Sequence, residues 1–340
     1  MRSLLIALLA FVAGVWLTTW WQPAPPAATA TATQTVTAKP AASVATAPTA
    51  ADTVVNADDR WPAGGPSPEQ LIYAQPQWVR NALAQLTPRV SGKPNLYLVA
   101  FAGDAGEDVF RNEVEYADRL FPARFGAATH TVVLENNPAS LGARPLASWS
   151  NLEAVLDGLA QVMHPDEDIL MLYVTSHGSE DHYLLVDMDP VPLDQIGAND
   201  LADILREHAF RWKVVVVNAC YSGGFVPPLR GDGTLVITAA RSDRSSFGCG
   251  SDSDITYFGK AWLVDALNHT DDFIDAFQRA SKTIAGWENL DKLTPSEPQI
   301  DVGKGIAAQL ARWRKSIVPG GTVPFTPATS PSAGSANIAR

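Results

Sequence analysis

The sequence contains only two cysteines, Cys220 and Cys249, among 340 residues. A framework of disulfides is therefore excluded, and at most one bridge can form. Metal-ligand spacings are missing as well. The six histidines are scattered along the chain, and neither a Cys-x-x-Cys nor a His-Glu-x-x-His pattern occurs. We expect no metal site and no cofactor.

Positive charge is also scarce. Lysine and arginine number 25 against 36 acidic residues, which gives a net charge of −11. Binding to a phosphate backbone needs a basic face, so we expect no nucleic-acid partner. A hydrophobic content of 46% with 18% charged residues is typical of a globular core that carries low-charge appendages.

An apolar run occupies the amino-terminal end, from Leu4 to Trp21. Its 18 residues are at the lower limit for a helix that spans a membrane, and the closing Trp20 and Trp21 suit the membrane interface. We expect residues 1–22 to anchor the protein in a membrane, with the folded domain outside the cytoplasm (the periplasm in a bacterium). The alternative is a cleaved signal and a secreted domain, since Ala28-Thr29-Ala30 could serve as a cleavage site.

Composition divides the rest of the chain. Residues 23–57 are mainly Ala, Thr and Pro, cannot bury a core, and are predicted to form an extended linker. Residues 58–317 form the predicted folded domain. Residues 318–340, rich in Pro, Gly, Ser, Thr and Ala, are predicted to be a disordered tail.

Within the domain, apolar runs alternate with stretches of helical spacing, which predicts a mostly parallel sheet covered by helices on both faces. The predicted strands are 95–102, 131–134, 169–174, 183–186, 214–217 and 235–239. The predicted helices are 68–86, 109–125, 152–163, 198–208, 255–267, 273–287 and 305–314.

Two of the predicted strands end in residues with complementary chemistry. KVVVVNACYSGGF (213–225) contains four consecutive valines, typical of a central parallel strand, and Cys220 follows it at a turn. DILMLYVTSHG (168–178) is a second apolar run, with His177 and Gly178 just past it. A lone Cys is more often a buried structural residue, and a lone His more often a loop residue.

Together, however, the two residues predict a nucleophilic site. Neighbouring parallel strands lie about 4.8 Å apart, so His177 and Cys220 would meet at one edge of the sheet, where open α/β sheets bind ligands. The separation of 43 positions from His177 to Cys220 (220 − 177) leaves room for a crossover with its own helix. A nearby imidazole lowers the pKa of a thiol and moves protons to the leaving group.

These motifs resemble those of legumain-type (asparaginyl endopeptidase) cysteine peptidases, which belong with metacaspases and gingipains to the caspase-like group. The matching segments are Thr175–Ser179, Asn218–Gly223, Ile237–Ala240, Ser245–Cys249 and Thr256–Gly259. The resemblance extends from about residue 95 to 310. It implies a caspase-like three-layer α/β/α fold with a mostly parallel six-stranded sheet.

The resemblance also implies roles. Cys220 would attack a peptide carbonyl, and His177 would protonate the leaving amine. The N–H groups of Gly178 and Cys220 would form the oxyanion hole. Arg111 and Asp252 would line the substrate pocket and read the carboxamide of an Asn, together with Ser245 or Ser246.

Three positions depart from the family or leave a question open. Tyr221 replaces the Glu that often follows the nucleophile, which weakens the expectation of an Asn preference. The family's Asn that orients the catalytic His is not evident, and either Asp104 or Asp108 could substitute. In an oxidising compartment Cys249 could pair with Cys220, although a buried free thiol is the commoner state.

The sequence thus predicts a cysteine endopeptidase, with transpeptidation as a further outcome of the same acyl-enzyme, acting on peptide or protein substrates. The alternative is a non-catalytic caspase-like module that is tethered to the membrane as a scaffold. A Cys-dependent phosphatase is excluded because Val226 stands where that chemistry requires Arg. A Ser hydrolase based on Ser222 lacks the Gly-x-Ser-x-Gly elbow. The sequence leaves the oligomeric state open.

Overall fold

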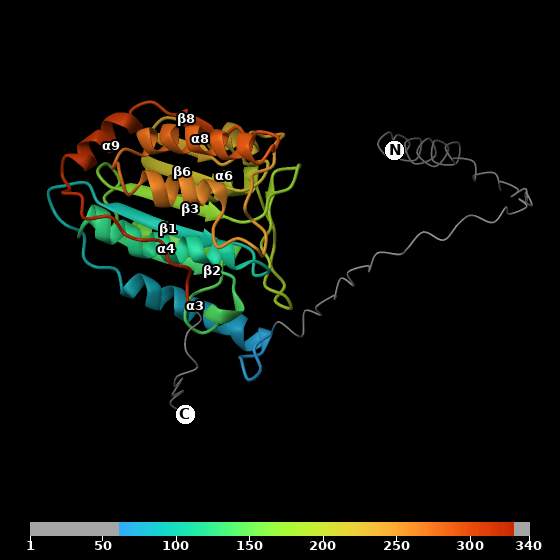
Figure 1. Cartoon of the computed structure of the whole chain (residues 1–340). Helices are drawn as coiled ribbons and strands as arrows, with labels where there is room; N and C mark the ends of the chain where they lie inside the picture. Colours follow the sequence, from blue (N-terminus) through green and yellow to red (C-terminus); the bar gives the residue numbers. More distant parts are fainter. Residues whose placement is uncertain (1–60, 330–340) are drawn as a thin grey trace, which may run out of the picture. The chain divides into compact units, whose positions relative to one another are not determined.

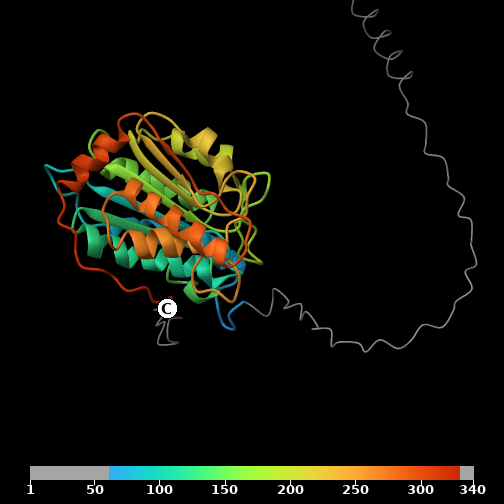
Figure 2. The same cartoon turned by 45° about the horizontal axis from the view of Figure 1, so that its top comes forward.

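A six-stranded sheet forms the centre of the protein, with helices on both faces (Figures 1 and 2). The computed structural model describes residues 61–329. The strand order is β2-β1-β3-β6-β7-β8, and every pairing is parallel except that of β8 with β7. The predicted three-layer architecture with a mostly parallel six-stranded sheet is confirmed.

The strands of this sheet are β1 (Leu96–Ala102), β2 (Thr129–Glu135), β3 (Ile169–Thr175), β6 (Trp212–Asn218), β7 (Thr234–Thr238) and β8 (Gln299–Val302). A separate two-stranded ribbon pairs β4 (Tyr183–Leu184) with β5 (Ile196–Gly197). The prediction of a strand over 183–186 therefore corresponds to a short ribbon outside the main sheet. The sixth strand of the main sheet is β8, which the sequence did not predict.

The two helical layers follow from the alternation of side chains along the strands. In β1, Leu96 and Leu98 face one hydrophobic core, and Tyr97 and Val99 face the other. The first core is covered by α4 (Asp108–Phe125), the π-helical turn η3 (Gly259–Ala266), α8 (Phe273–Leu290) and α9 (Ile306–Arg314). The second is covered by α3 (Pro68–Ala84), α5 (Trp149–Val162), α6 (Ala198–Arg206) and α7 (Val226–Leu229).

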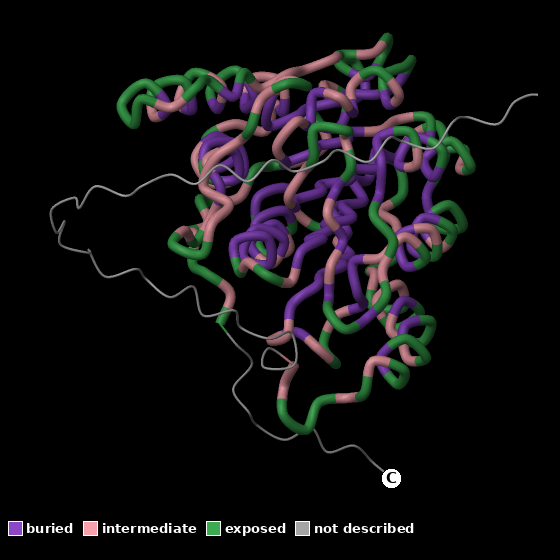
Figure 3. The backbone as a smooth tube through the Cα atoms, turned by 90° about the vertical axis from the view of Figure 1, so that its right-hand side faces the viewer, coloured by how far each residue is buried: buried purple, intermediate pink, exposed green. Residues whose placement is uncertain are grey.

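Burial follows the same layering. Figure 3 shows the buried backbone concentrated in the middle of the domain and the exposed backbone on the outer turns and loops. All seven residues of β1 and of β3 are buried, as expected for strands covered on both faces. The sheet is therefore a rigid base for whatever its carboxyl edge carries.

Residues 318–329 differ from the prediction of a disordered tail. They run as an extended segment along α4, drawn in red in Figure 1. Side chains of α4 bind its backbone: Tyr116 donates to the carbonyl of Val323 (2.8 Å), and the Phe325 ring packs edge-on against Tyr116 at 5.4 Å. Composition hides this interaction because most of it rests on backbone groups, with only Val323 and Phe325 packing apolar side chains against the core.

The predicted anchor and linker, residues 1–22 and 23–57, lie outside the described residues, as do residues 330–340. No helix between residues 61 and 329 is long and apolar enough to cross a membrane.

Candidate active site

The carboxyl ends of β3 and β6 lie side by side, as the sequence predicted. Thr175 is paired in register with Asn218, and the N–H of Ser176 donates to the Asn218 carbonyl at 3.2 Å. Just beyond these pairs stand His177 and Cys220. Gly178 lies so close that a Cβ on it would collide with the carbonyl oxygen of Cys220. The glycine is therefore required for the two loops to approach each other.

A buried carboxylate fixes the ends of both strands. Glu113 of α4 is fully buried. It accepts hydrogen bonds from the Tyr173 hydroxyl (2.7 Å), the Thr175 hydroxyl (2.7 Å) and the Asn218 amide (2.8 Å). It also accepts from the N–H (3.0 Å) and the hydroxyl (2.6 Å) of Thr256. Charged acceptors make strong hydrogen bonds, so Glu113 links β3, β6 and the loop before η3.

We did not predict Glu113 from the sequence. It is one acidic residue among several in an amphipathic helix, and its partners come from three other segments of the chain. The alternation of side chains along a strand offered one signal. Tyr173 and Thr175 lie on the same side of the β3 segment as His177, and Asn218 lies on the same side of the β6 segment as Cys220. Polar residues at such positions of buried strands need a buried partner.

The Cys220 thiol is surrounded by hydrogen-bond donors. The backbone N–H of Ser246 lies 3.3 Å from Sγ, and the Ser246 hydroxyl 3.6 Å from it. The thiol of Cys249 donates to Cys220 and is the main cause that lowers the pKa of Cys220 to about 5, against the opposing effect of burial. Ser246 and the charge of His177 lower it further. The pKa of Cys249 is raised because the Cys220 thiolate holds its proton.

Both cysteines are free thiols, and both are half-buried. Cys249, expected to be a buried free thiol, is thus only half-buried. It borders Cys220 and, as a hydrogen-bond donor that keeps its proton, stabilises the Cys220 thiolate.

His177 faces Asp104. Its Nε2 lies 3.7 Å from Oδ2 of Asp104, whose side chain is 6% exposed. The ring also packs edge-on against Phe110, with centroids 5.1 Å apart. Asp108, the other candidate for the orienting group, instead accepts a hydrogen bond from the Asn137 amide at 2.9 Å. Of the two candidates, the structure therefore places Asp104, and not Asp108, beside His177.

Two backbone donors remain available beside the nucleophile. Within residues 61–329, neither the N–H of Gly178 nor that of Cys220 donates to a protein acceptor. The flanking groups are occupied: Leu185 donates to the His177 carbonyl (3.0 Å) and Tyr221 to the Arg244 carbonyl (2.7 Å). The positions predicted for an oxyanion hole are thus free to bind an oxygen.

The predicted pocket of Arg111 and Asp252 is not formed. Arg111 is buried, with Nε 3.6 Å from Glu135 and its guanidinium donating to the Thr329 carbonyl at 3.0 Å. Asp252 is exposed in the loop after Cys249. No contact joins Arg111 to Asp252 in the part of the chain that the structure describes. The cause is the rotation of α4, which turns Phe110 and Glu113 toward the strand ends and Arg111 away.

The two serines that were predicted to line the substrate pocket, Ser245 and Ser246, lie in different environments. Ser246 contacts the Cys220 sulfur directly. Ser245 is exposed and lines an open cavity beside Tyr221. Only Ser246 is therefore part of the nucleophile's surroundings.

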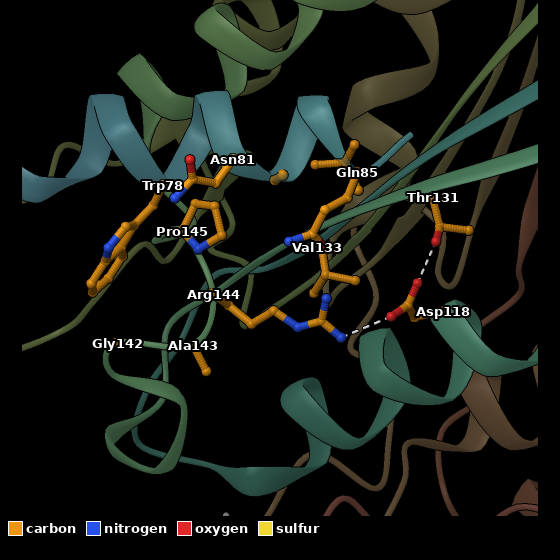
Figure 4. A pocket seen from close by; sticks show the side chains of 12 residues that line it. Trp78, Asn81, Gln85, Asp118, Thr131, Val133, Gly142, Ala143, Arg144 and Pro145 are labelled. Atoms are coloured by element: carbon orange, nitrogen blue, oxygen red, sulfur yellow. Dashed lines mark hydrogen bonds and ion pairs between the residues drawn. The ribbon is translucent and has the colours of Figure 1, made fainter. Parts of the chain in front are cut away.

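A separate hollow of about 350 Å³ lies between α3 and β2 (Figure 4). In it the Arg144 guanidinium donates to Asp118 at 2.7 Å, and the Thr131 hydroxyl donates to the same carboxylate. Neither Cys nor His lines it. Its charged groups, Arg144 and Asp118, are paired with each other, and the hollow shares no residue with the candidate active site. Among residues 61–329, no group of three or more His, Cys, Asp or Glu side chains could hold a metal ion.

Comparison with known proteins gives a family match over part of the chain. Residues 149–309, which include His177 and Cys220, match the model of the Peptidase C13 family. No curated protein matches the chain.

Two solved structures are similar at low identity. One is a secreted C11 cysteine protease from Bacteroides thetaiotaomicron in complex with an irreversible peptide inhibitor. It shares 12% identity at a TM-score of 0.39, over 57% of this chain and 59% of that chain. The other is pro-sf-caspase-1, with 12% identity at a TM-score of 0.40, over 64% of this chain and 92% of that chain.

Proposed function

We propose that the protein is a cysteine endopeptidase that works through a His177–Cys220 dyad and an acyl-enzyme, because residues 149–309 match the model of the Peptidase C13 (legumain) family. The observation that carries the proposal is the thiol of Cys220. It lies at the end of β6, where the backbone N–H of Ser246 is 3.3 Å from its sulfur, and the Cys249 thiol, Ser246 and His177 lower its pKa to about 5. A thiol at that pKa is a thiolate at neutral pH, which is the nucleophilic form.

The reaction follows from the neighbours of that thiolate. Its sulfur attacks the carbonyl carbon of a peptide bond, and the carbonyl oxygen gains the negative charge. The N–H groups of Gly178 and Cys220 stabilise this oxygen. When the C–N bond breaks, His177 gives a proton to the leaving amine, and the acyl group stays on Cys220. Water then hydrolyses the thioester, while an amine acceptor would instead give transpeptidation.

The residue before the cleaved bond is a separate question. The family resemblance implies Asn or Asp, yet Arg111 donates to residues 328 and 329 and faces Glu135. A preference for Asn or Asp would need other groups in this structure. The assay must therefore read the residue preference without assuming it.

The test uses the full chain in detergent and a mixed peptide library, with new termini read by mass spectrometry. Cys220→Ala and His177→Ala should each abolish cleavage, with unfolding transitions like that of the wild type. His164→Ala is the matched control, because His164 is exposed in a turn before β3. An amine acceptor added to the same reaction separates hydrolysis from transpeptidation by the mass of the product.

Cleavage that survives in the Cys220→Ala variant would refute the dyad. No cleavage by the wild type, with Cys220 also slow to alkylate near neutral pH, would favour the alternative of a tethered scaffold.

We further propose that residues 1–22 anchor the enzyme in a membrane with its domain outside the cytoplasm. The proposal rests on the apolar run Leu4–Trp21. Cell fractionation tests it: the full chain should sediment with membranes and resist a salt wash. Recovery of a shortened chain in the soluble exported fraction would instead support a cleaved signal.

A further inference from the structure

A second cavity lies directly beside the nucleophile loop. It has a volume of about 510 Å³ and lies between Tyr221, the loop 243–247 and residues 292–294. Tyr221 follows Cys220, and its N–H donates to the Arg244 carbonyl at 2.7 Å. Ser245 precedes the residue that contacts the Cys220 sulfur. A peptide whose carbonyl reaches Cys220 would thus lie next to this cavity, because Tyr221 belongs both to the nucleophile loop and to the cavity wall.

Two cations line the cavity, Arg244 and Lys292. Neither forms a salt bridge or a side-chain hydrogen bond within residues 61–329. The acid that shares the cavity, Asp243, is bound through both oxygens by Arg241, at 2.5 and 3.0 Å. Asp291, next to Lys292, accepts a hydrogen bond from the Tyr257 hydroxyl. Two cations and one acid line the cavity, and that acid is paired with Arg241, so the lining carries a net positive charge.

The side chain of Arg244 lacks a hydrogen-bond partner for one of its buried atoms. Its Nε is buried and donates to no partner in the described part of the chain. Buried polar groups are almost always hydrogen-bonded, and an exception calls for an explanation. A guanidinium is satisfied best by a carboxylate, which can accept two parallel hydrogen bonds.

The walls of the cavity are held in place. The carbonyl of Phe247 accepts a hydrogen bond from the Tyr257 N–H at 2.9 Å, and the Tyr257 ring packs edge-on against Trp287 at 5.5 Å. On the other side, Lys292 has a left-handed backbone (φ 57°), and the next N–H, of Leu293, donates to Glu288 at 2.8 Å. The cations are thus presented from two fixed loops.

We propose that this cavity is a subsite for an acidic side chain, Asp or Glu, of the peptide substrate. The carboxylate would accept from the Arg244 guanidinium and interact with the Lys292 ammonium, while the Phe247 ring contacts the methylene groups. The inference rests on the proposed peptidase function and names part of its substrate class. The recognised residue lies near the cleaved bond but makes no contact with Cys220 itself.

The experiment uses the full chain and pairs of synthetic peptides around one bond that the enzyme cleaves. Each pair places Glu or Gln at one of the positions flanking that bond. We expect one position at which kcat/KM is about tenfold higher for Glu than for Gln, equivalent to about 1.4 kcal/mol. Arg244→Ala should bring this ratio close to one, and Lys292→Ala should reduce it. Arg244→Glu should favour Lys at that position.

Lys282→Ala is the matched control, because Lys282 is an exposed cation on α8 outside the cavity. It should leave the Glu/Gln ratio unchanged. A ratio near one at every position in the wild type would overturn the proposal, and so would a ratio that persists in Arg244→Ala.

A binding measurement keeps this test independent of turnover. Fluorescent Glu and Gln peptides are titrated onto the Cys220→Ala variant, with and without Arg244→Ala. If the Glu peptide binds about tenfold more tightly than the Gln peptide, and this difference disappears with Arg244→Ala, the subsite is supported even if no peptide is cleaved. Equal affinities would overturn the subsite while leaving the peptidase function standing.

Discussion

Removal of the Cys249 thiol should raise the pKa of the nucleophile. In the structure the Cys249 S–H donates to Cys220 and is the largest of the contributions that lower the pKa of Cys220 from 9.0 to about 5. The variant Cys249→Ala keeps the backbone and removes only this donor. Ser246 and His177 still contribute, so the pKa should not return fully to 9.0.

The size of the shift follows from the energy of one hydrogen bond. A hydrogen bond to a charged group contributes about 1.5–3 kcal/mol, and one pKa unit corresponds to about 1.36 kcal/mol. Loss of the Cys249 donor should therefore raise the pKa of Cys220 by about 1–2 units. At pH 5 about half of the wild-type thiols would be ionised, but only about a tenth or fewer in the variant.

The assay is the rate of iodoacetamide alkylation of Cys220 across a pH series, with each cysteine followed separately by peptide mapping. The midpoint should lie near pH 5 in the wild type and 1–2 units higher in Cys249→Ala. Cys249→Ser keeps a donor and should show a smaller shift. The acidic limb of kcat/KM should move with the alkylation midpoint. An unchanged midpoint in Cys249→Ala would refute the idea that this thiol stabilises the nucleophile.

Three further parts of the structure can be tested with single changes. Asp104→Asn should lower kcat about tenfold with little change in KM, because it leaves His177 without the carboxylate that orients it. A proportional rise in KM would argue against that role. Burial raises the pKa of Glu135 from 4.5 to about 7, so its contribution to stability is complete below pH 4.5 and is lost as the pH rises through 7. In the wild type the free energy of unfolding should therefore fall by up to about 3 kcal/mol as the pH rises, and in Glu135→Gln this fall should be absent. Urea unfolding at pH 5 and pH 8 measures it. A chain that ends after residue 317 should unfold about 2–4 kcal/mol more easily than the full chain, because α4 loses several hydrogen bonds and the Phe325 contact. A chain that ends after residue 329 is the control and should match the full chain.

The centre of the fold and the nucleophilic pair were predictable from local patterns. Long β-branched and aliphatic runs identify central parallel strands, and the ends of such strands share one edge. His177 and Cys220 therefore had to be neighbours once β3 and β6 were adjacent. β8 was missed because its four residues, QIDV, form a short antiparallel edge strand with little apolar content.

Other features depend on rotations and contacts that a sequence pattern does not encode. The direction of Arg111 is set by how α4 packs on the sheet. Hydrophobic periodicity predicts which face of the helix is buried, but it does not predict which end of the sheet each side chain contacts. The segment 318–329 is held mainly through its carbonyl and N–H groups. Backbone binding leaves no trace in composition, so the segment resembled a disordered tail.

Helix α4 connects these observations, because its faces serve different purposes. One face places Glu113 under the ends of β3 and β6, where it holds together the two strand ends that precede His177 and Cys220. Another face binds the segment 318–329 and uses Arg111 to do so. Because both faces of α4 already contact other parts of the protein, few of its side chains are available to bind a substrate. Selectivity in this enzyme should therefore reside in the loops after β7 and α8, where Arg244 and Lys292 are still without partners among the described residues, rather than in α4.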